Sequence, residues 1–126
     1  MFIINDDRSI YLTRGDIAVI EISAMKSETE AYTFQVGDVV RFNVFEKKRC
    51  DIVVLQKDVT VDTEATSVAI VLDGVDTKLG ELINKPKEYW YEVELNPDTM
   101  PQTIVGYDDD GPKILRLFPE GDDTSV

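Results

Sequence analysis

The segment YWYEVELN, residues 89–96, decides the fold class because its apolar residues recur at every second position. A β-strand places alternate side chains on opposite faces, so this pattern predicts a strand with one buried face. The residues expected in the core are Tyr89, Tyr91, Val93 and Leu95. The residues expected toward solvent are Trp90, Glu92, Glu94 and Asn96. An amphipathic helix would need a period near 3.6 residues, which this segment lacks.

Six further segments show a similar alternation and predict short strands. They are residues 16–23, 39–45, 50–57, 66–72, 102–108 and 112–118. No window sustains a helical period, so at most one or two helical turns are expected, in 23–32 and around Leu79 and Leu82. About seven to nine strands at this spacing are typical of an all-β sandwich or a small barrel. Uneven strand lengths and the long connection at 72–86 favour an antiparallel β-sandwich.

The dipeptide Gly-Asp precedes two of these segments, at Gly15-Asp16 and at Gly37-Asp38. Glycine permits a tight backbone entry and Asp can accept hydrogen bonds from nearby amides, so each dipeptide is predicted to open a strand. Arg14 turns the first one into Arg-Gly-Asp, a tripeptide that animal cells read as an adhesion signal. That interpretation is rejected, because Asp16 begins an apolar run and no export signal is visible.

Two later turns are predicted from Pro97 and Gly111. Pro97 has the fixed φ that a type I turn favours, and Gly111 closes an Asp-rich hairpin loop between two apolar segments. The loop, YDDDG at 107–111, carries oxygen atoms of the kind that Ca²⁺ binds. It lacks the ligand spacing of an EF-hand, so a hairpin turn is the preferred interpretation and no metal is predicted.

The composition indicates one acidic domain. The 126 residues, 43% of them hydrophobic, suit a single domain over 1–126, with an acidic tail at 119–126 that is expected to fray. The net charge of −12 disfavours nucleic acid and anionic membranes, because both attract clustered Lys and Arg. The start of the chain lacks the apolar stretch of a signal peptide, and no segment approaches the about 18 apolar residues of a spanning helix. Synthesis in a cytoplasm is expected.

No catalytic site is predicted. Histidine is absent, which removes the commonest general base and metal ligand. Cys50 is the single cysteine, so no intrachain disulfide can form, and it is interpreted as a small residue at a strand start rather than a reactive thiol. Carboxylate pairs are uninformative among 25 acidic residues, and the glycines at 74–80 lack the order of a phosphate-binding loop. The chain is predicted to be non-enzymatic and to need no cofactor.

Trp90 is the candidate for a contact surface, together with Glu92 and Glu94 on the same strand face. Aromatic residues are enriched where proteins meet partners, whereas Tyr89 and Tyr91 are expected in the core. Two alternatives stay open. One is a carbohydrate-binding module that uses Trp90 and the tyrosines. The other is a small hydrolase that uses two carboxylates set in a cleft.

The chain resembles the N-terminal domain of phage baseplate upper proteins and related small proteins of prophage tail modules. The resemblance rests on IYLTRGDIAVIEI (10–22), YTFQVGDVVRFNVF (32–45) and GELINKPKEYWYEVEL (80–95). The closing ELNPDTMPQTIVGYDDDGPKILRLFPEG (94–121) is similar to proteins of gut Firmicutes phages and prophages. The resemblance as a whole covers roughly residues 8–118 and implies an immunoglobulin-like β-sandwich in the virion. The implied function is a structural module that docks on other tail or baseplate proteins, with no catalytic residues. Since such assemblies are symmetric, a homo-oligomer is a further expectation.

Overall fold

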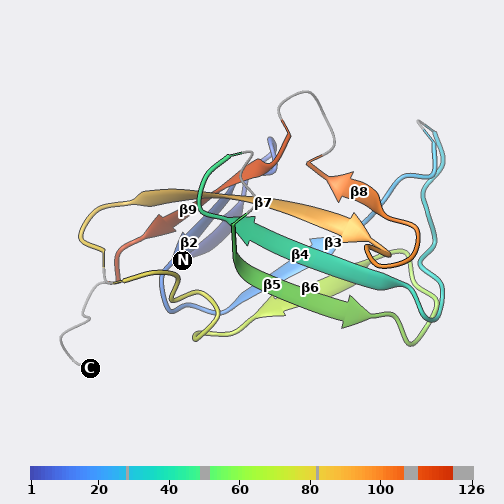
Figure 1. The fold of residues 1–126 in the computed structure, drawn as a ribbon, viewed down its shortest axis with the longest axis horizontal. Helices are drawn as coiled ribbons and strands as arrows, with labels where there is room; N and C mark the ends of the chain where they lie inside the picture. The colour runs from blue at the N-terminus through green and yellow to red at the C-terminus, as the bar shows by residue number, and fades with distance from the viewer. Residues whose placement is uncertain (28, 49–51, 82, 107–110, 121–126) are drawn as a thin grey trace.

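Nine β-strands form the fold of the residues that the structure, a computed structural model, describes: 1–27, 29–48, 52–81, 83–106 and 111–120 (Figure 1). The strands are β1 (Phe2–Ile4), β2 (Ile10–Thr13), β3 (Ala18–Ile22), β4 (Val39–Phe45), β5 (Val53–Thr60), β6 (Val68–Leu72), β7 (Lys87–Leu95), β8 (Gln102–Val105) and β9 (Lys113–Phe118). No helix occurs within the described residues, which confirms the predicted all-β class.

The strands form two sheets. The larger sheet has the order β1-β2-β9-β7-β4-β5, and β8 pairs with the end of β7 that β9 does not reach. The smaller sheet consists of β3 and β6. β2 and β9 run parallel, so the prediction of purely antiparallel sheets is wrong at this pair. Nearly the whole chain separates these two strands, and therefore no tight turn fixes their relative direction.

Both sheets contribute side chains to one hydrophobic core. The smaller sheet buries alternate residues of its two strands: Ala18, Ile20, Ile22, Val68, Ile70 and Leu72. The central strands of the larger sheet bury Val40, Phe42, Val44, Tyr89, Tyr91, Val93 and Leu95. The alternation expected for 89–96 is therefore present in β7. A core shared by two sheets is consistent with the predicted sandwich, and the immunoglobulin-like topology stays a prediction.

Asn43 departs from the alternation because it is buried although it faces away from this core. Its amide group donates to Glu94 Oε1 at 3.0 Å, and its Oδ1 accepts from Gln56 Nε2 at 3.0 Å. A buried amide side chain costs free energy unless its polar atoms are paired. The two hydrogen bonds supply that pairing and join β4 to both neighbouring strands, β5 and β7.

The two Gly-Asp dipeptides adopt the same turn. Gly15 has φ of 91° and Gly37 has φ of 95°. The amide of Asp16 donates to Thr13 O, and the amide of Asp38 donates to Gln35 O, both at 3.0 Å. A positive φ at the third residue with this closing hydrogen bond is the pattern of a type II turn, in which glycine is favoured.

Arg14 is buried, with 9% of its surface exposed. Its guanidinium donates to the carbonyl oxygens of Leu79 and Gly80 at 3.4 and 3.2 Å, and it pairs with Glu120 at 2.5 Å. An adhesion motif needs an accessible Arg, so this geometry agrees with the rejection of the adhesion interpretation.

Several sequence predictions concern segments without regular strands. The helical turn expected around Leu79 is not formed, since Leu79 has no regular structure and residues 74–77 before it form a turn. In the segment 23–32, Met25 pairs with Ala31 in an isolated bridge. Pro97 lies in the turn after β7, where the amide of Met100 donates to Asn96 O at 3.0 Å. Gly111 has φ of 70°. The predictions for Cys50, Leu82, the Asp-rich stretch 107–110 and the tail 121–126 lie outside the described residues.

Candidate functional site

The predicted contact residues Trp90, Glu92 and Glu94 share the face of β7 that points away from the core, and all three are half-buried. Trp90 lies opposite Phe45 of β4 and Ile114 of β9. It also lines a hollow of about 210 Å³, together with side chains that include two lysines: Asp7, Ser9, Lys48, Pro112, Lys113 and Ile114.

Tyr89 and Tyr91 lie on the opposite, buried face, with 2% and 3% exposure. The three aromatic rings therefore form no common platform on which a sugar could stack. Trp90 is the aromatic residue of this trio that remains near the surface.

Glu92 is the carboxyl on this face whose environment disfavours its charge. Burial, followed by repulsion from Glu94, raises the pKa of Glu92. Asn43 donates a hydrogen bond to Glu94, whereas Arg41 pairs with Asp58 at 2.8 Å and with Asp98 at 3.2 Å. Hydrogen bonding to Arg41 lowers the pKa of Asp58 against the opposing effect of burial. These ion pairs join strands and a loop. Asp58 and Asp98, paired with Arg41, therefore do not resemble the two carboxyl groups of a hydrolase cleft.

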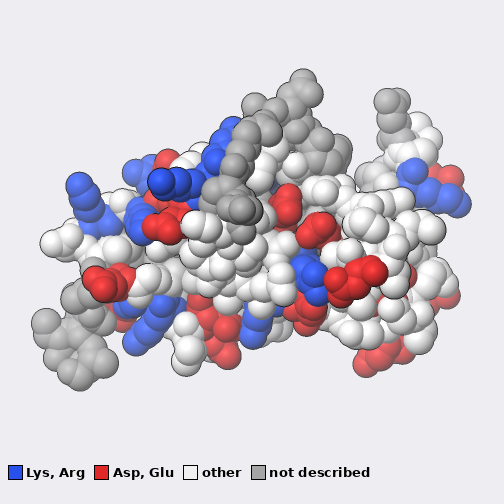
Figure 2. All heavy atoms as spheres, in the orientation of Figure 1, with Lys and Arg blue, Asp and Glu red and all other residues white. Residues whose placement is uncertain are grey.

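Charges of both signs are interspersed on the face that carries β4 and β5 at the front of the view. Figure 2 shows Lys and Arg next to Asp and Glu there, with no single broad basic patch on that face. A surface that recognises phosphate backbones gathers Lys and Arg into a patch or stripe. This face does not have that arrangement.

The smaller sheet has a second, apolar face. We call it the apolar outer face and define it by four exposed side chains: Ile17 at 65%, Val19 at 46%, Val71 at 51% and Val75 at 82% exposure. Val19 and Val71 lie directly opposite each other on β3 and β6. Their strand neighbours are buried in the core, so both faces of this two-stranded sheet carry aliphatic residues.

Ile17 and Val75 lie at the same end of this sheet. Thr77, in the turn after β6, donates its hydroxyl to Asp16 O at 2.8 Å and accepts a hydrogen bond from the amide of Gly15 at 3.0 Å. These bonds fix the turn that carries Val75 against the residues that precede Ile17. The exposed Ile17 and Val75 thus lie in segments that these hydrogen bonds hold together at one end of the smaller sheet.

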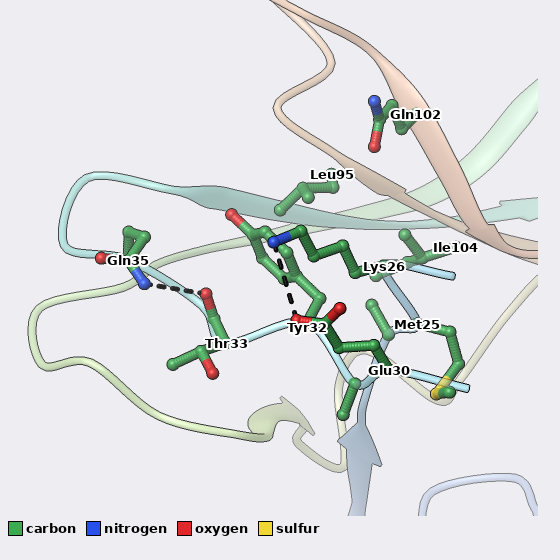
Figure 3. Close-up of a pocket in the computed structure, with 11 residues that line it drawn as sticks. Met25, Lys26, Glu30, Tyr32, Thr33, Gln35, Leu95, Gln102 and Ile104 are labelled. Carbon is green, nitrogen blue, oxygen red and sulfur yellow. Dashed lines mark hydrogen bonds and ion pairs between the residues drawn. The ribbon is translucent and has the colours of Figure 1, made fainter. Parts of the chain in front are cut away.

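A groove runs beside β8, between this strand and residues 23–35 (Figure 3). It consists of two overlapping hollows of about 440 and 510 Å³. Both are lined by Ala24, Met25, Gln102 and Ile104. We call these two hollows the β8 groove.

Tyr32 lines the first hollow, and the second Gly-Asp turn fixes its position. The Tyr32 hydroxyl donates to Asp38 Oδ2 at 2.6 Å. The same carboxylate accepts from the Gln35 amide at 2.9 Å and from Asn96 Nδ2 at 3.1 Å. Burial acts to raise the pKa of Asp38, but the hydrogen bonds from Tyr32, Gln35 and Asn96 outweigh it and lower this pKa.

The described residues contain no group of three or more Cys, Asp or Glu placed to hold a metal ion. Nor do they form a helix long and apolar enough to cross a membrane.

The apolar outer face and the β8 groove were both missed in the sequence. The first left a signal, because IAVI at 17–20 is apolar without interruption, so residues on both faces of β3 are aliphatic. The second left none, because it forms between segments nearly eighty residues apart in the chain.

Comparison with protein-family models gives no match, and comparisons with curated proteins and with solved structures give none either. The resemblance to baseplate upper proteins therefore rests on the sequence segments quoted above.

Proposed function

We propose that this chain is a non-enzymatic assembly module of a bacteriophage or prophage tail or baseplate, which docks on neighbouring virion proteins. The observation that carries the proposal is the apolar outer face. In this account the chain is made in a bacterial cytoplasm and becomes part of the virion. The sequence resemblance supplies the setting, and the surface supplies the mode of action.

Exposed aliphatic residues on adjacent strands favour a protein partner. Single exposed apolar side chains are ordinary, whereas a continuous apolar patch is typical of an interaction site. Val19 and Val71 lie side by side across the two strands, and the exposed Ile17 immediately precedes β3. Each such side chain gains up to about 1.5–3 kcal/mol when it is fully buried. Part of this gain is offset by the loss of translational and rotational freedom on association.

The charges around this face indicate what kind of partner fits it. Asp16, Glu21 and Asp73 flank the apolar residues in the sequence and are at least partly exposed. The Met1 ammonium pairs with Asp16, and the nearby Lys78 pairs with Glu120 at 3.9 Å. The whole chain carries a net charge of −12. A second copy would bring like charges together, whereas a neighbouring protein with an apolar patch rimmed by Lys or Arg would be complementary. We therefore assign the face to a different virion protein, and the predicted homo-oligomer would need another surface.

Particle incorporation tests this proposal. The bacterium that encodes the chain would produce particles with the wild-type protein, with the double variant Ile17→Asp/Val75→Asp, or with Val36→Asp as the control. Val36 is also exposed, at 69%, and lies outside the apolar outer face. All three positions are solvent-exposed, so the fold is expected to persist, as circular dichroism would verify.

Quantitative mass spectrometry of purified particles gives the readout. The proposal predicts a fixed molar ratio of wild-type and Val36→Asp protein to the other particle proteins, and at least a tenfold loss for the double variant, equivalent to about 1.4 kcal/mol. Absence of the wild-type protein from particles would refute the virion setting. Equal incorporation of the double variant would refute the role of the apolar outer face.

The carbohydrate-binding alternative has less support. Its strongest observation is the hollow beside Trp90, which two lysines also line. The burial of Tyr89 and Tyr91 removes the other rings that this alternative needs.

A further inference from the structure

The outer edge of β8 has unpaired main-chain groups. β8 pairs with β7 on one side, and the described residues make no main-chain hydrogen bond to its other side. In an antiparallel pair, alternate residues direct their N–H and C=O groups away from the partner strand. These groups are available to a further strand.

The edge also lacks the features that usually prevent strand addition. Its residues are Gln102, Thr103, Ile104 and Val105, with no charge and no proline. Charged residues on an edge strand oppose pairing with another chain. The edge strand β5, in contrast, carries Lys57 and Asp58 in ion pairs with Asp76 and Arg41.

The β8 groove lies along this edge and has the size and lining for an extended segment. Its apolar surface comes from Ala24, Met25, Leu95 and Ile104, and Met25 is 58% exposed. In Figure 3, Leu95, Ile104 and Met25 surround the hollow, with Gln102 at its rim. A strand added to β8 would place every second side chain over this apolar surface.

The charges that line the β8 groove differ in balance from those of the whole chain. Arg8 and Lys26 contribute two positive charges, and Glu30 contributes one negative charge. Lys26 and Glu30 form a pair at 3.7 Å that is weak because both side chains are exposed to solvent. Arg8 forms no ion pair with another described residue. In a molecule of charge −12, the lining of the groove thus has an excess of one positive charge, which favours a carboxylate as the group it would meet.

We propose that the β8 groove binds an extended segment of a partner protein, which adds as a strand to β8, places an aliphatic side chain over Ala24 and Ile104, and directs a carboxylate to Arg8. Main-chain hydrogen bonds hold the segment, and the groove selects its side chains. This site is separate from the apolar outer face, and the inference does not depend on the proposed function.

Fluorescence anisotropy with defined peptides tests the inference. The first probe is a fluorescein-labelled heptapeptide with alternating Val and Thr between terminal Asp residues. The second has Lys in place of both Asp residues, and the third carries N-methyl groups on the Val amides of the first. Arg8→Asn removes the charge with a residue that tolerates the positive φ of 72° found at Arg8. Met25→Glu places a carboxylate at the groove wall, and Lys85→Asn is the charge-matched control at an exposed site elsewhere.

Saturable binding of the first probe is expected, with NMR shift changes at the amides of residues 102–105. Arg8→Asn is expected to weaken this binding about threefold and Met25→Glu about tenfold, while Lys85→Asn leaves it unchanged. The N-methylated probe is expected not to bind. The inference is overturned if no probe saturates up to about 1 mM. Equal binding of the Lys probe, wild-type affinity in both groove variants, or shift changes at β1 or β5 instead would overturn it as well.

Discussion

Replacing Asp38 by Ala is expected to lower the free energy of unfolding by about 3 kcal/mol at pH 7. The Asp38 carboxylate accepts three hydrogen bonds, from the Tyr32 hydroxyl, the Gln35 amide and Asn96 Nδ2. Each contributes about 1 kcal/mol, a value below the about 1.5–3 kcal/mol usual for a charged acceptor because the site is partly exposed. The substitution also removes the side-chain hydrogen bond from Asn96, after β7, to the Gly-Asp turn before β4.

The pH dependence supplies a second, independent check. The folded protein holds the pKa of Asp38 below the ordinary value of 3.8, so it binds fewer protons here than the unfolded chain near that pH. The stabilisation is therefore complete above pH 3.8 and is lost as the pH falls through the lower, folded-state pKa. The difference between wild type and Asp38→Ala should be constant from about pH 7 to 5 and should shrink below about pH 3.8.

Urea unfolding, monitored by Trp90 fluorescence at several pH values, measures both the loss of unfolding free energy and its pH dependence. Asp98→Ala is the matched control, since Asp98 is 76% exposed and pairs with Arg41 at 3.2 Å. Its loss should cost less than about 1 kcal/mol. A loss below about 1 kcal/mol for Asp38→Ala, or a difference that persists unchanged into strong acid, would show that this carboxylate is not the centre of the turn.

Substitutions at two other positions test separate parts of the fold. Glu92→Gln is expected to raise the free energy of unfolding at pH 7 by up to about 1 kcal/mol, because a raised pKa means that the ionised form is disfavoured in the folded state. This gain should vanish below about pH 4.5, and a loss of stability at pH 7 would contradict the assignment. Gly37→Ala is expected to cost about 1–2 kcal/mol, since φ is 95° and a Cβ meets no other atom within 4 Å, so the cost is purely that of the backbone. Gly37→Asn should cost less in the same urea experiment, and equal stability of the Ala variant would contradict the turn geometry.

The sequence predicted those strands whose alternation is uninterrupted. β4, β6 and β7 follow the predicted ranges closely, because each has one face in the core. β5 was predicted over 50–57 and is observed at Val53–Thr60. Lys57 and Asp58 resemble the start of a loop, yet ion pairs with Asp76 and Arg41 keep them in the strand.

Features that depend on distant parts of the chain were not predictable. β1 was not predicted because three apolar residues give too little pattern. The position of β2 in the sheet depends on its parallel pairing with β9, which lies far away in the sequence. The burial of Asn43 depends on Gln56 and Glu94, which only the sheet brings close. The β8 groove needs Met25 and Ile104 together, and no local rule relates them.

Photo-cross-linking in assembled particles tests the central claim most directly. A benzophenone amino acid would replace Ile17, Val75 or, as the control, Val36, all of them exposed in the isolated chain. The account predicts that positions 17 and 75 cross-link to one and the same other virion protein, while position 36 does not. Particles that contain the chain but give no cross-link from positions 17 and 75, or give the same products from position 36, would contradict it.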